Sequence, residues 1–285
     1  MISRCRGSEW ILKLVIKVGR CVLETGPIAT TLTVAVKELL TEGHRITVVH
    51  GGGTMACQNL SSSNGSNTDG KEDSSLNDYG HEAALKTMAE INRKFVATFA
   101  AAMIPAFGVC GGDGNIIHIR KFSRFPASEP IAEAVRVDPH WLNVISQNGG
   151  VPVLASVAVG YDRQFYRLYS DQLASGCAVG WDADALIFVT SQKGLLNSDE
   201  STVRWLEIDE ADRMIRSRLL SQSMVAKLRA CCDALRRGVR RARILPASEV
   251  DRIASFYFAR IEAGTEIFVG PSSVDHFDYK RSLSD

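Results

Sequence analysis

The sequence predicts an α/β protein with a largely parallel sheet that helices cover on both faces. Short apolar runs, typical of buried strands, alternate along the chain with segments of helical apolar spacing. The first strand, helix and strand follow one another within about forty residues, and such a βαβ unit joins parallel strands. At 285 residues, with 45% hydrophobic and 23% charged residues, the chain can also bury a large core.

The predicted elements begin with this βαβ unit. Strands at residues 11–16 and 46–49 flank a helix at 28–42, which Gly43 ends. The polar, turn-rich segment at residues 61–78 is expected to be a mobile surface loop. The remaining predicted elements are helices at 80–102, 141–148, 171–181 and 225–237, strands at 103–109, 116–120, 151–155, 165–168, 185–190, 242–245 and 266–269, and a polar tail at 271–285.

Charge and cysteine content narrow the class of protein. A net charge of +1 gives no overall attraction to nucleic acid or to an anionic membrane, so neither is expected as a partner. Seven cysteines, an odd number without a Cys-x-x-Cys pair, predict reduced thiols and a cytoplasmic protein. Lys13 and Lys17 interrupt the apolar run near the start, which argues against a signal peptide. The six histidines form no ligand-spaced cluster, so no metal site is expected.

Two strand ends carry candidate anion-binding residues. Lys17 stands at the carboxyl end of the first predicted strand, where open α/β sheets bind their ligands. The run Gly51-Gly52-Gly53 follows the second strand, and its backbone can approach a phosphate or carboxylate closely. A solvated lysine and a flexible turn are the structural alternatives. The glycine run matches neither the Walker loop nor the dinucleotide-binding motif.

Two predicted helix starts carry further charged candidates. Asp171 opens a helix directly after Ser170 and could serve only as a helix cap. Lys227 lies near the start of a later helix, where a positive charge is disfavoured unless an anion binds there. Spacing alone leaves both interpretations of each residue open.

In their order along the chain, these residues resemble the amino acid kinase family, and within it the acetylglutamate kinases. The resemblance covers roughly residues 11–269. Each motif is weak alone, and the ordered set is specific. The motifs are Lys17-Val18-Gly19, Val48-Val49-His50-Gly51-Gly52-Gly53, Ser170-Asp171, Leu186-Ile187-Phe188-Val189-Thr190 with Gly194-Leu195-Leu196, Met224-x-x-Lys227 and Gly264-Thr265.

The resemblance implies a three-layer α/β/α sandwich of the carbamate kinase-like type, as a single domain over residues 1–285. An N-terminal lobe, residues 11–180, would bind the amino-acid substrate, and a C-terminal lobe, residues 181–270, would bind ATP. The implied reaction is ATP-dependent phosphorylation of a carboxylate to an acyl phosphate. In the acetylglutamate kinases the acceptor is N-acetyl-L-glutamate, in arginine biosynthesis. Mg²⁺ would accompany ATP, and a homodimer is expected.

The same resemblance assigns roles to individual residues. Lys17 and Lys227 would neutralise the transferred phosphoryl group, and Asp171 would hold both lysines in place. This agrees with the chemistry, because a carboxylate acceptor is already ionised and needs positioning and positive charge rather than a base. Further candidates on the substrate and phosphate side are Gly19, Arg20, Gly51, Gly52, Gly53, Arg167 and Ser170, and those on the ATP side are Thr190, Ser191, Gly194, Leu195 and Met224.

Several positions depart from the family's pattern. Arg20 replaces the second glycine of Lys-x-Gly-Gly, and residues 65–80 lack the Arg-x-Thr segment whose arginine grips the substrate carboxylate. Ser191 replaces an aspartate, and Ser223 replaces the glycine before the methionine. In place of Asn-x-Asn-Ala, the chain has Arg167-Leu168-Tyr169-Ser170.

These departures keep the phosphate machinery and alter the acceptor pocket. One hypothesis is that Arg167 replaces the missing arginine from another side of the pocket. Two alternatives stay open: a family member with a different acceptor, and a catalytically weak homologue that binds nucleotide or amino acid and regulates a partner. Outside the site, residues 236–243 hold five arginines and are interpreted as a solvated helix end, with contact to nucleic acid or an acidic effector as the alternative. His50 is expected to pack beneath its strand end.

Overall fold

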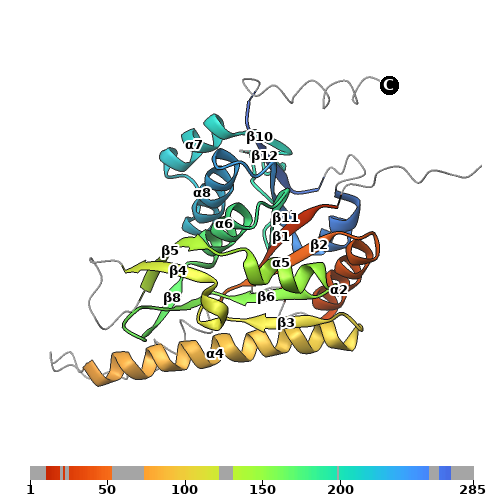
Figure 1. The fold of residues 1–285 in the computed structure, drawn as a ribbon. Helices are drawn as coiled ribbons and strands as arrows, with labels where there is room; N and C mark the ends of the chain where they lie inside the picture. The colour runs from red at the N-terminus through yellow and green to blue at the C-terminus, as the bar shows by residue number, and fades with distance from the viewer. Residues whose placement is uncertain are drawn as a thin grey trace, which may run out of the picture.

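The computed structural model describes residues 11–19, 22, 26–52, 74–121, 131–197, 199–256 and 263–270 (Figure 1). Two sheets form within these ranges, and the larger one runs through the centre of the molecule. Its inner strands are short runs rich in Val, Ile and Leu, and their residues are almost all buried. Such runs suit a parallel sheet that is covered on both faces.

The central sheet has eight strands in the order β10-β12-β11-β9-β1-β2-β6-β3. Neighbouring strands are parallel, except that β11 and β12 are antiparallel. The predicted, largely parallel sheet is therefore confirmed. The strands are β1 (Lys13–Val18), β2 (Arg45–His50), β3 (Ala106–Val109), β6 (Val151–Ala155), β9 (Ala185–Thr190), β10 (Trp205–Glu207), β11 (Arg241–Pro246) and β12 (Thr265–Phe268).

A smaller sheet continues from β6 and has the strand order β4-β5-β8-β7. Strands β5 and β8 are parallel, and the pairs β4–β5 and β7–β8 are antiparallel. Strand β8 matters for function because it leads directly into the first turn of α6. The strands are β4 (Ile117–Lys121), β5 (Ile131–Val137), β7 (Val157–Val159) and β8 (Phe165–Leu168).

Helices cover both faces of the central sheet, as Figure 1 shows. Along β1, Val15 packs in the core under α5, α6, α7 and α8, whereas Ile16 packs in the core under α2, α4 and the 3-10 helix η2. Alternate strand residues thus face opposite layers, and the three-layer sandwich is confirmed. The helices are α2 (Gly26–Thr41), α4 (Ser74–Ala101), α5 (His140–Gln147), α6 (Ser170–Gly180), α7 (Ile208–Ser217), α8 (Gln222–Arg236), η1 (Asp113–Asn115) and η2 (Ala247–Phe256).

The predicted loop over residues 61–78 is wrong at its C-terminal end, because helix α4 already begins at Ser74. Ser, Asn and Asp favour turns in isolation. Here they extend a helix whose later turns are anchored by Phe95 and Phe99 in the core, and tertiary packing of this kind outweighs local propensity. Residues 61–73 and the predicted tail at 271–285 lie outside the described residues.

Candidate active site

Lys17 lies near the end of β1 with its side chain in the layer that contains α6 and α8. Val15 packs in that layer, and the alternation of strand side chains places Lys17 on the same face. Its neighbours across the sheet are Val49 of β2 and Phe188 of β9. Lys17 is only 7% exposed, so the interpretation as a solvated lysine is wrong. A buried ammonium group needs an anionic partner.

Asp171 provides that partner. Tyr169 occupies the N-cap position of α6 without a capping side-chain hydrogen bond, so Asp171 is not the helix cap. Asp171 Oδ1 lies 2.7 Å from Lys17 Nζ, and Oδ2 lies 3.8 Å from Lys227 Nζ. All three side chains are largely buried, at 14% exposure or less. One carboxylate therefore holds two lysines that come from opposite ends of the chain.

Lys227 reaches this carboxylate from the first two turns of α8. Ser221 caps the helix, and its Oγ accepts a hydrogen bond from Met224 N at 3.3 Å. Helical side chains point back toward the N-terminus, and Lys227 Nζ donates to Ser223 Oγ at 2.8 Å and to Ser223 O at 3.3 Å. The ammonium thus lies over the first turn, where unpaired N–H groups and the helix dipole favour an anion.

The glycine motif meets the start of α6. A Cβ atom on Gly51 would lie 2.8 Å from Ser170 Oγ and 3.6 Å from Ser156 Oγ. Only glycine allows the backbone to approach this closely, and Ser156 N fastens the same point by donating to His50 O at 3.1 Å. The structure therefore brings Gly51 and Ser170 together. Gly52 beside them is buried.

Three other residues of the predicted phosphate side have different outcomes. Gly19 follows β1, and its N–H donates to Val189 O at 3.0 Å, which fastens the end of β1 to β9. That N–H is therefore engaged within the protein. Arg20 and Gly53 lie outside the described residues.

Arg167 faces the N-terminal half of α4. It is opposite Val157 in the antiparallel β7–β8 pair, and residues opposite one another share a face of the sheet. Val157 packs against Ala84 and Met88 of α4, whereas Tyr166 packs in the other layer's core. The Nε of Arg167 is buried and has no hydrogen-bond partner among the described residues. The guanidinium is thus directed toward the space between β8 and α4, and its Nε–H is available to donate a hydrogen bond to a ligand.

Four of the five predicted ATP-side residues lie at the carboxyl end of β9 and in the loop that follows, and Met224 lies in the first turn of α8. Thr190 ends β9 and is 6% exposed. Gly194 has a φ of +118°, and a Cβ there would lie 2.8 Å from Thr265 Oγ1. That hydroxyl accepts a hydrogen bond from Leu195 N at 2.8 Å, so the loop is tied to the start of β12. Ser191 beside it is exposed. The side chains of Leu195 and Met224 pack in the hydrophobic core.

His50 packs beneath the end of β2, as expected. It is fully buried, its Nε2 lies 3.0 Å from Asn92 Nδ2, and its ring lies 5.3 Å from that of Phe95. Burial lowers the pKa of His50 from 6.5 to about 4, and the charge of nearby Lys17 acts in the same direction. The imidazole is therefore neutral at physiological pH and adds no positive charge beneath the glycine motif.

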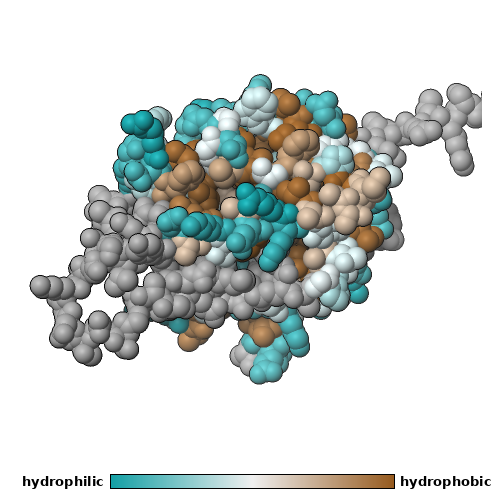
Figure 2. All heavy atoms as spheres, turned by 90° about the horizontal axis from the view of Figure 1, so that it is seen from below, coloured by the Kyte–Doolittle hydropathy of each residue, from teal (hydrophilic) through white to brown (hydrophobic). Residues whose placement is uncertain are grey.

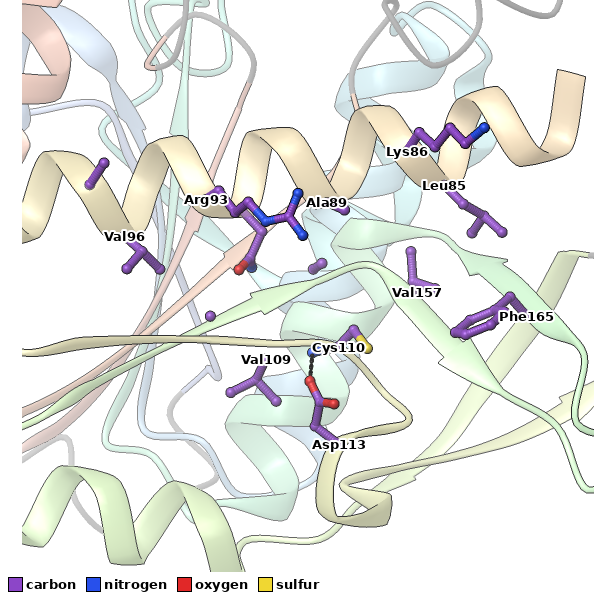
Figure 3. A pocket seen from close by; sticks show the side chains of 14 residues that line it. Leu85, Lys86, Ala89, Arg93, Val96, Val109, Cys110, Asp113, Val157 and Phe165 are labelled. Carbon is purple, nitrogen blue, oxygen red and sulfur yellow. Dashed lines mark hydrogen bonds between the residues drawn. The ribbon is translucent and has the colours of Figure 1, made fainter.

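A pocket of about 700 Å³ lies beside the site, between α4 and the carboxyl ends of β3 and β6 (Figure 3). Its wall is mainly apolar and includes Leu85, Val96 and Val157. Polar groups lie at its edge, and Asp113 there accepts a hydrogen bond from Cys110 N at 2.8 Å. The pocket thus offers apolar surface at the end of β6, where Ala155 lines its wall.

The arginines of residues 236–243 are all paired with carboxylates. The interpretation as a solvated helix end holds for Arg236 and Arg237, which are exposed at the end of α8, and is wrong for the two arginines that lie in β11. Arg241 and Arg243 lie in β11 and share Glu266, which is 4% exposed. Arg243 itself is 3% exposed. The other three form the pairs Arg236–Asp212, Arg237–Asp233 and Arg240–Asp184. Each charge is locally neutralised, and the run is not an open basic patch.

Two negative findings apply to the described ranges only. No group of three or more His, Cys, Asp or Glu residues there could hold a metal ion. No helix there has the length and apolar character needed to cross a membrane.

Two serines that are not among the predicted site residues also lie at the site formed by the two lysines, Asp171 and the glycine motif. Ser156 lies against Gly51, and Ser223 contacts Lys227. The four-residue spacing of Ser223 and Lys227 on one helix was the available signal for the second contact. For Ser156 the signal was weaker, because its position depends on the pairing of β2 with β6.

This geometry suits a reaction between two anions. Two buried ammonium groups, a helix N-terminus and a closely approached glycine converge at the carboxyl ends of β1 and β2, with a single carboxylate between the lysines. The model of the "Amino acid kinase family" matches residues 13–246 of the chain. The chain belongs to the amino acid kinase family.

Curated relatives align over most of this amino acid kinase chain. An acetylglutamate kinase from Acidobacterium capsulatum is 34% identical over 263 residues, which cover 90% of this chain and 99% of the relative. An acetylglutamate kinase from Koribacter versatilis is 31% identical over 266 residues, covering 90% of this chain and 98% of the relative. Both alignments therefore extend across the two halves of the fold that supply the lysines.

Solved structures share the fold at low sequence identity. The N-acetylglutamate synthase from Neisseria gonorrhoeae, complexed with coenzyme A and N-acetyl-glutamate, superposes with a TM-score of 0.76 and 18% identity. That likeness covers 95% of this chain, which spans only 64% of the synthase chain. Giardia carbamate kinase superposes with a TM-score of 0.64 and 14% identity, covering 91% of this chain and 99% of that chain. These similarities establish the fold and not the acceptor.

Proposed function

We propose that this amino acid kinase transfers the γ-phosphoryl group of ATP to a carboxylate, converting N-acetyl-L-glutamate to N-acetyl-L-glutamyl 5-phosphate in arginine biosynthesis. The observation that carries the proposal is the buried trio Lys17, Asp171 and Lys227. The names of the curated relatives favour N-acetyl-L-glutamate as the acceptor.

The trio's charges suit this transfer. The acceptor carboxylate, with an ordinary pKa of about 4.3, is ionised at neutral pH and attacks the γ-phosphorus without a general base. An oxygen–phosphorus bond forms to the acceptor, the bond to the bridging oxygen breaks, and ADP leaves with the electron pair. The main barrier is the approach of two anions, so fixed positive charge and in-line positioning supply most of the catalysis. Lys17 and Lys227 provide that charge, and Asp171 sets their separation.

The two substrates would occupy different parts of the chain. We place the acceptor on residues 11–180, against Gly51, Ser170 and Arg167, and ATP on residues 181–270, beside Thr190 and the loop tied to Thr265. Mg²⁺ would enter with the nucleotide, since it binds phosphate oxygens readily and keeps several waters. Mg²⁺ would draw negative charge from the phosphates, while the lysines act on the transferred group.

We place the enzyme in the cytoplasm because its described cysteines are free thiols. Burial raises the pKa of Cys177 to about 12 and that of Cys232 to about 11, so both stay protonated. Reduced, buried thiols are usual in a reducing compartment.

The acceptor assignment is tested by trapping the acyl phosphate with hydroxylamine. Purified protein with MgATP should form a hydroxamate from N-acetyl-L-glutamate, and much less from glutamate, aspartate or N-acetyl-aspartate. Hydroxamate from a different member of the panel would replace the acceptor in the proposal. ATP binding without hydroxamate from any member would favour the catalytically weak regulatory homologue.

Arg167 is proposed to grip a carboxylate of the acceptor. Replacing it by alanine removes a charge-assisted contact worth about 1.5–3 kcal/mol, so the acceptor KM should rise roughly 10- to 100-fold. The KM for ATP should stay near its wild-type value, because the residue faces α4 on the acceptor side. Arg167→Lys keeps the positive charge but loses the forked guanidinium group. Its acceptor KM should therefore lie between those of the wild type and Arg167→Ala. An unchanged acceptor KM in Arg167→Ala would remove this residue from the pocket.

The free edge of the central sheet suits a homodimer. Among the described residues, strand β3 ends the sheet with an unpaired edge, and Phe107 on it is 51% exposed. Figure 2, seen from below the view of Figure 1, shows a hydrophilic band with apolar side chains above it and to its right. Edge strands next to apolar surface readily pair with another chain. We therefore propose that two copies associate across β3 and the flank of α4.

Size-exclusion chromatography with light scattering on the eluted protein measures this association. A mass of twice 31.1 kDa is expected for the wild-type chain, and Phe107→Glu should shift it toward the monomer by placing a charge at the interface. Tyr161→Glu changes another exposed aromatic, in the turn between β7 and β8, and should leave the mass unchanged. A monomeric wild-type protein would rule out the dimer.

A further inference from the structure

We propose that Ser223 positions Lys227 for phosphoryl transfer and that its hydroxyl group also binds the phosphate chain of the nucleotide. This rests on the proposed function and adds a residue to its phosphate side. It begins from one hydrogen bond, in which Lys227 Nζ donates to Ser223 Oγ at 2.8 Å.

The helix geometry makes this contact specific. Residues four apart lie on the same face of a helix, and a side chain points toward the preceding turn. Ser223 is in the first turn of α8 and Lys227 in the second, so the ammonium folds back onto the serine. The same ammonium lies 3.3 Å from Ser223 O and 3.8 Å from Asp171 Oδ2. Of these three oxygens, the hydroxyl of Ser223 is the closest to it.

Exposure places the serine between the lysine and solvent. Lys227 is 7% exposed, whereas Ser223 is exposed. A phosphate that approaches Lys227 along the helix N-terminus therefore meets Ser223 first. The first-turn N–H groups of Gln222 and Ser223 point the same way, because helical N–H groups point toward the N-terminus and these two precede the first intrahelical bonds.

The hydroxyl can serve both neighbours at once. A serine oxygen accepts through its lone pairs and donates through its single proton. The lysine uses an acceptor position, so the proton remains available for an anionic phosphate oxygen. With nucleotide bound, a chain of donors would run from Lys227 through Ser223 to the phosphate, and the hydroxyl would fix the ammonium at one distance from the transferred group.

Substitution of Ser223 tests both parts. Ser223→Ala and Ser223→Gly each remove the hydroxyl and should lower kcat roughly 10-fold, the loss expected for a hydrogen bond to a charged group. Both should weaken MgATP binding, measured by calorimetry without acceptor, by roughly 3- to 10-fold, with the acceptor KM unchanged. Ser223→Thr restores a hydroxyl at the same place and should return both values to within about 2-fold of wild type.

Ser221→Ala is the matched control, because this serine caps the same helix and its hydroxyl accepts a hydrogen bond from the backbone N–H of Met224. It should lower the melting temperature and leave MgATP affinity and kcat near wild type. Equal MgATP affinity and equal kcat in wild type and Ser223→Ala would overturn the inference, as would failure of threonine to restore them. If wild-type protein phosphorylates no acceptor, calorimetry still decides: weaker MgATP binding in Ser223→Ala supports the phosphate contact, and unchanged binding overturns it.

Discussion

Replacing Lys227 by alanine should lower kcat for acyl-phosphate formation by about 10²- to 10³-fold. The ammonium acts on charge that shifts during transfer, in a buried setting where water screens it poorly, and removing one such fixed donor has an effect of this size. The KM for the acceptor should change little, since the acceptor is proposed to bind on the other half of the fold. Steady-state kinetics with hydroxylamine trapping measure both constants.

Loss of activity in this variant should not come from unfolding. Asp171 keeps Lys17 at 2.7 Å, so removing Lys227 leaves no unpaired buried charge. Lys37→Ala is the matched control, because this lysine is exposed on α2 and its ammonium donates to Ala102 O. It should leave kcat unchanged. A Lys227→Ala enzyme with wild-type kcat would exclude the lysine from the reaction.

Asp171→Asn should cost about 3 kcal/mol of folding free energy in the absence of ligand. The variant keeps the shape of the side chain and removes its charge, which leaves Lys17 and Lys227 buried together without an anion. Removing one partner from a buried ion pair typically costs about 3–5 kcal/mol, and the lower end applies because the carboxylate is 14% exposed. Thermal or urea unfolding measures the loss.

Added anion should recover part of that stability. MgATP or inorganic phosphate can occupy the place of the carboxylate, so either should stabilise Asp171→Asn more than wild type. Asp233→Asn removes a half-exposed carboxylate from the same helix layer and should show little change with or without anion. Equal stability of Asp171→Asn and wild type would mean that the carboxylate does not hold the lysines.

The central sheet could be predicted from sequence because its strands are continuous apolar runs. Runs such as Ala185–Thr190 are recognisable without knowledge of their neighbours. Helix α7 was missed because it buries few side chains, chiefly Ile208 and Ala211, and its other residues are mostly charged. Strand β7 is three residues long, and its pairing with β8 rather than its own pattern defines it. Elements held by tertiary contacts leave a weak local signal.

The candidate site likewise has a part that the sequence predicts and a part that depends on tertiary packing. Lys17 and Asp171 could be proposed from their positions at a strand end and a helix start, but their 2.7 Å contact depends on how α6 packs over β1. The arginine run shows the reverse case, because its sequence suggests a solvated helix end, or an open basic patch as the alternative, rather than ion pairs in a strand. Its partners, among them Glu266 and Asp184, come from other strands and loops. A charge pattern alone could not reveal that pairing.

The place of β1 in the sheet order has a consequence for how the chain is made. It is synthesised before the other described strands, yet it lies between β2 and β9, and β9 leaves the ribosome only after the whole N-terminal lobe. One edge of β1 thus stays unpaired during translation until β9 has been made. Such non-local pairing is slow, and the unpaired strand edge is prone to aggregation in the meantime. Lys227 arrives later still. Regain of phosphoryl transfer after denaturation would therefore report the last stage of folding, when the whole sheet has closed.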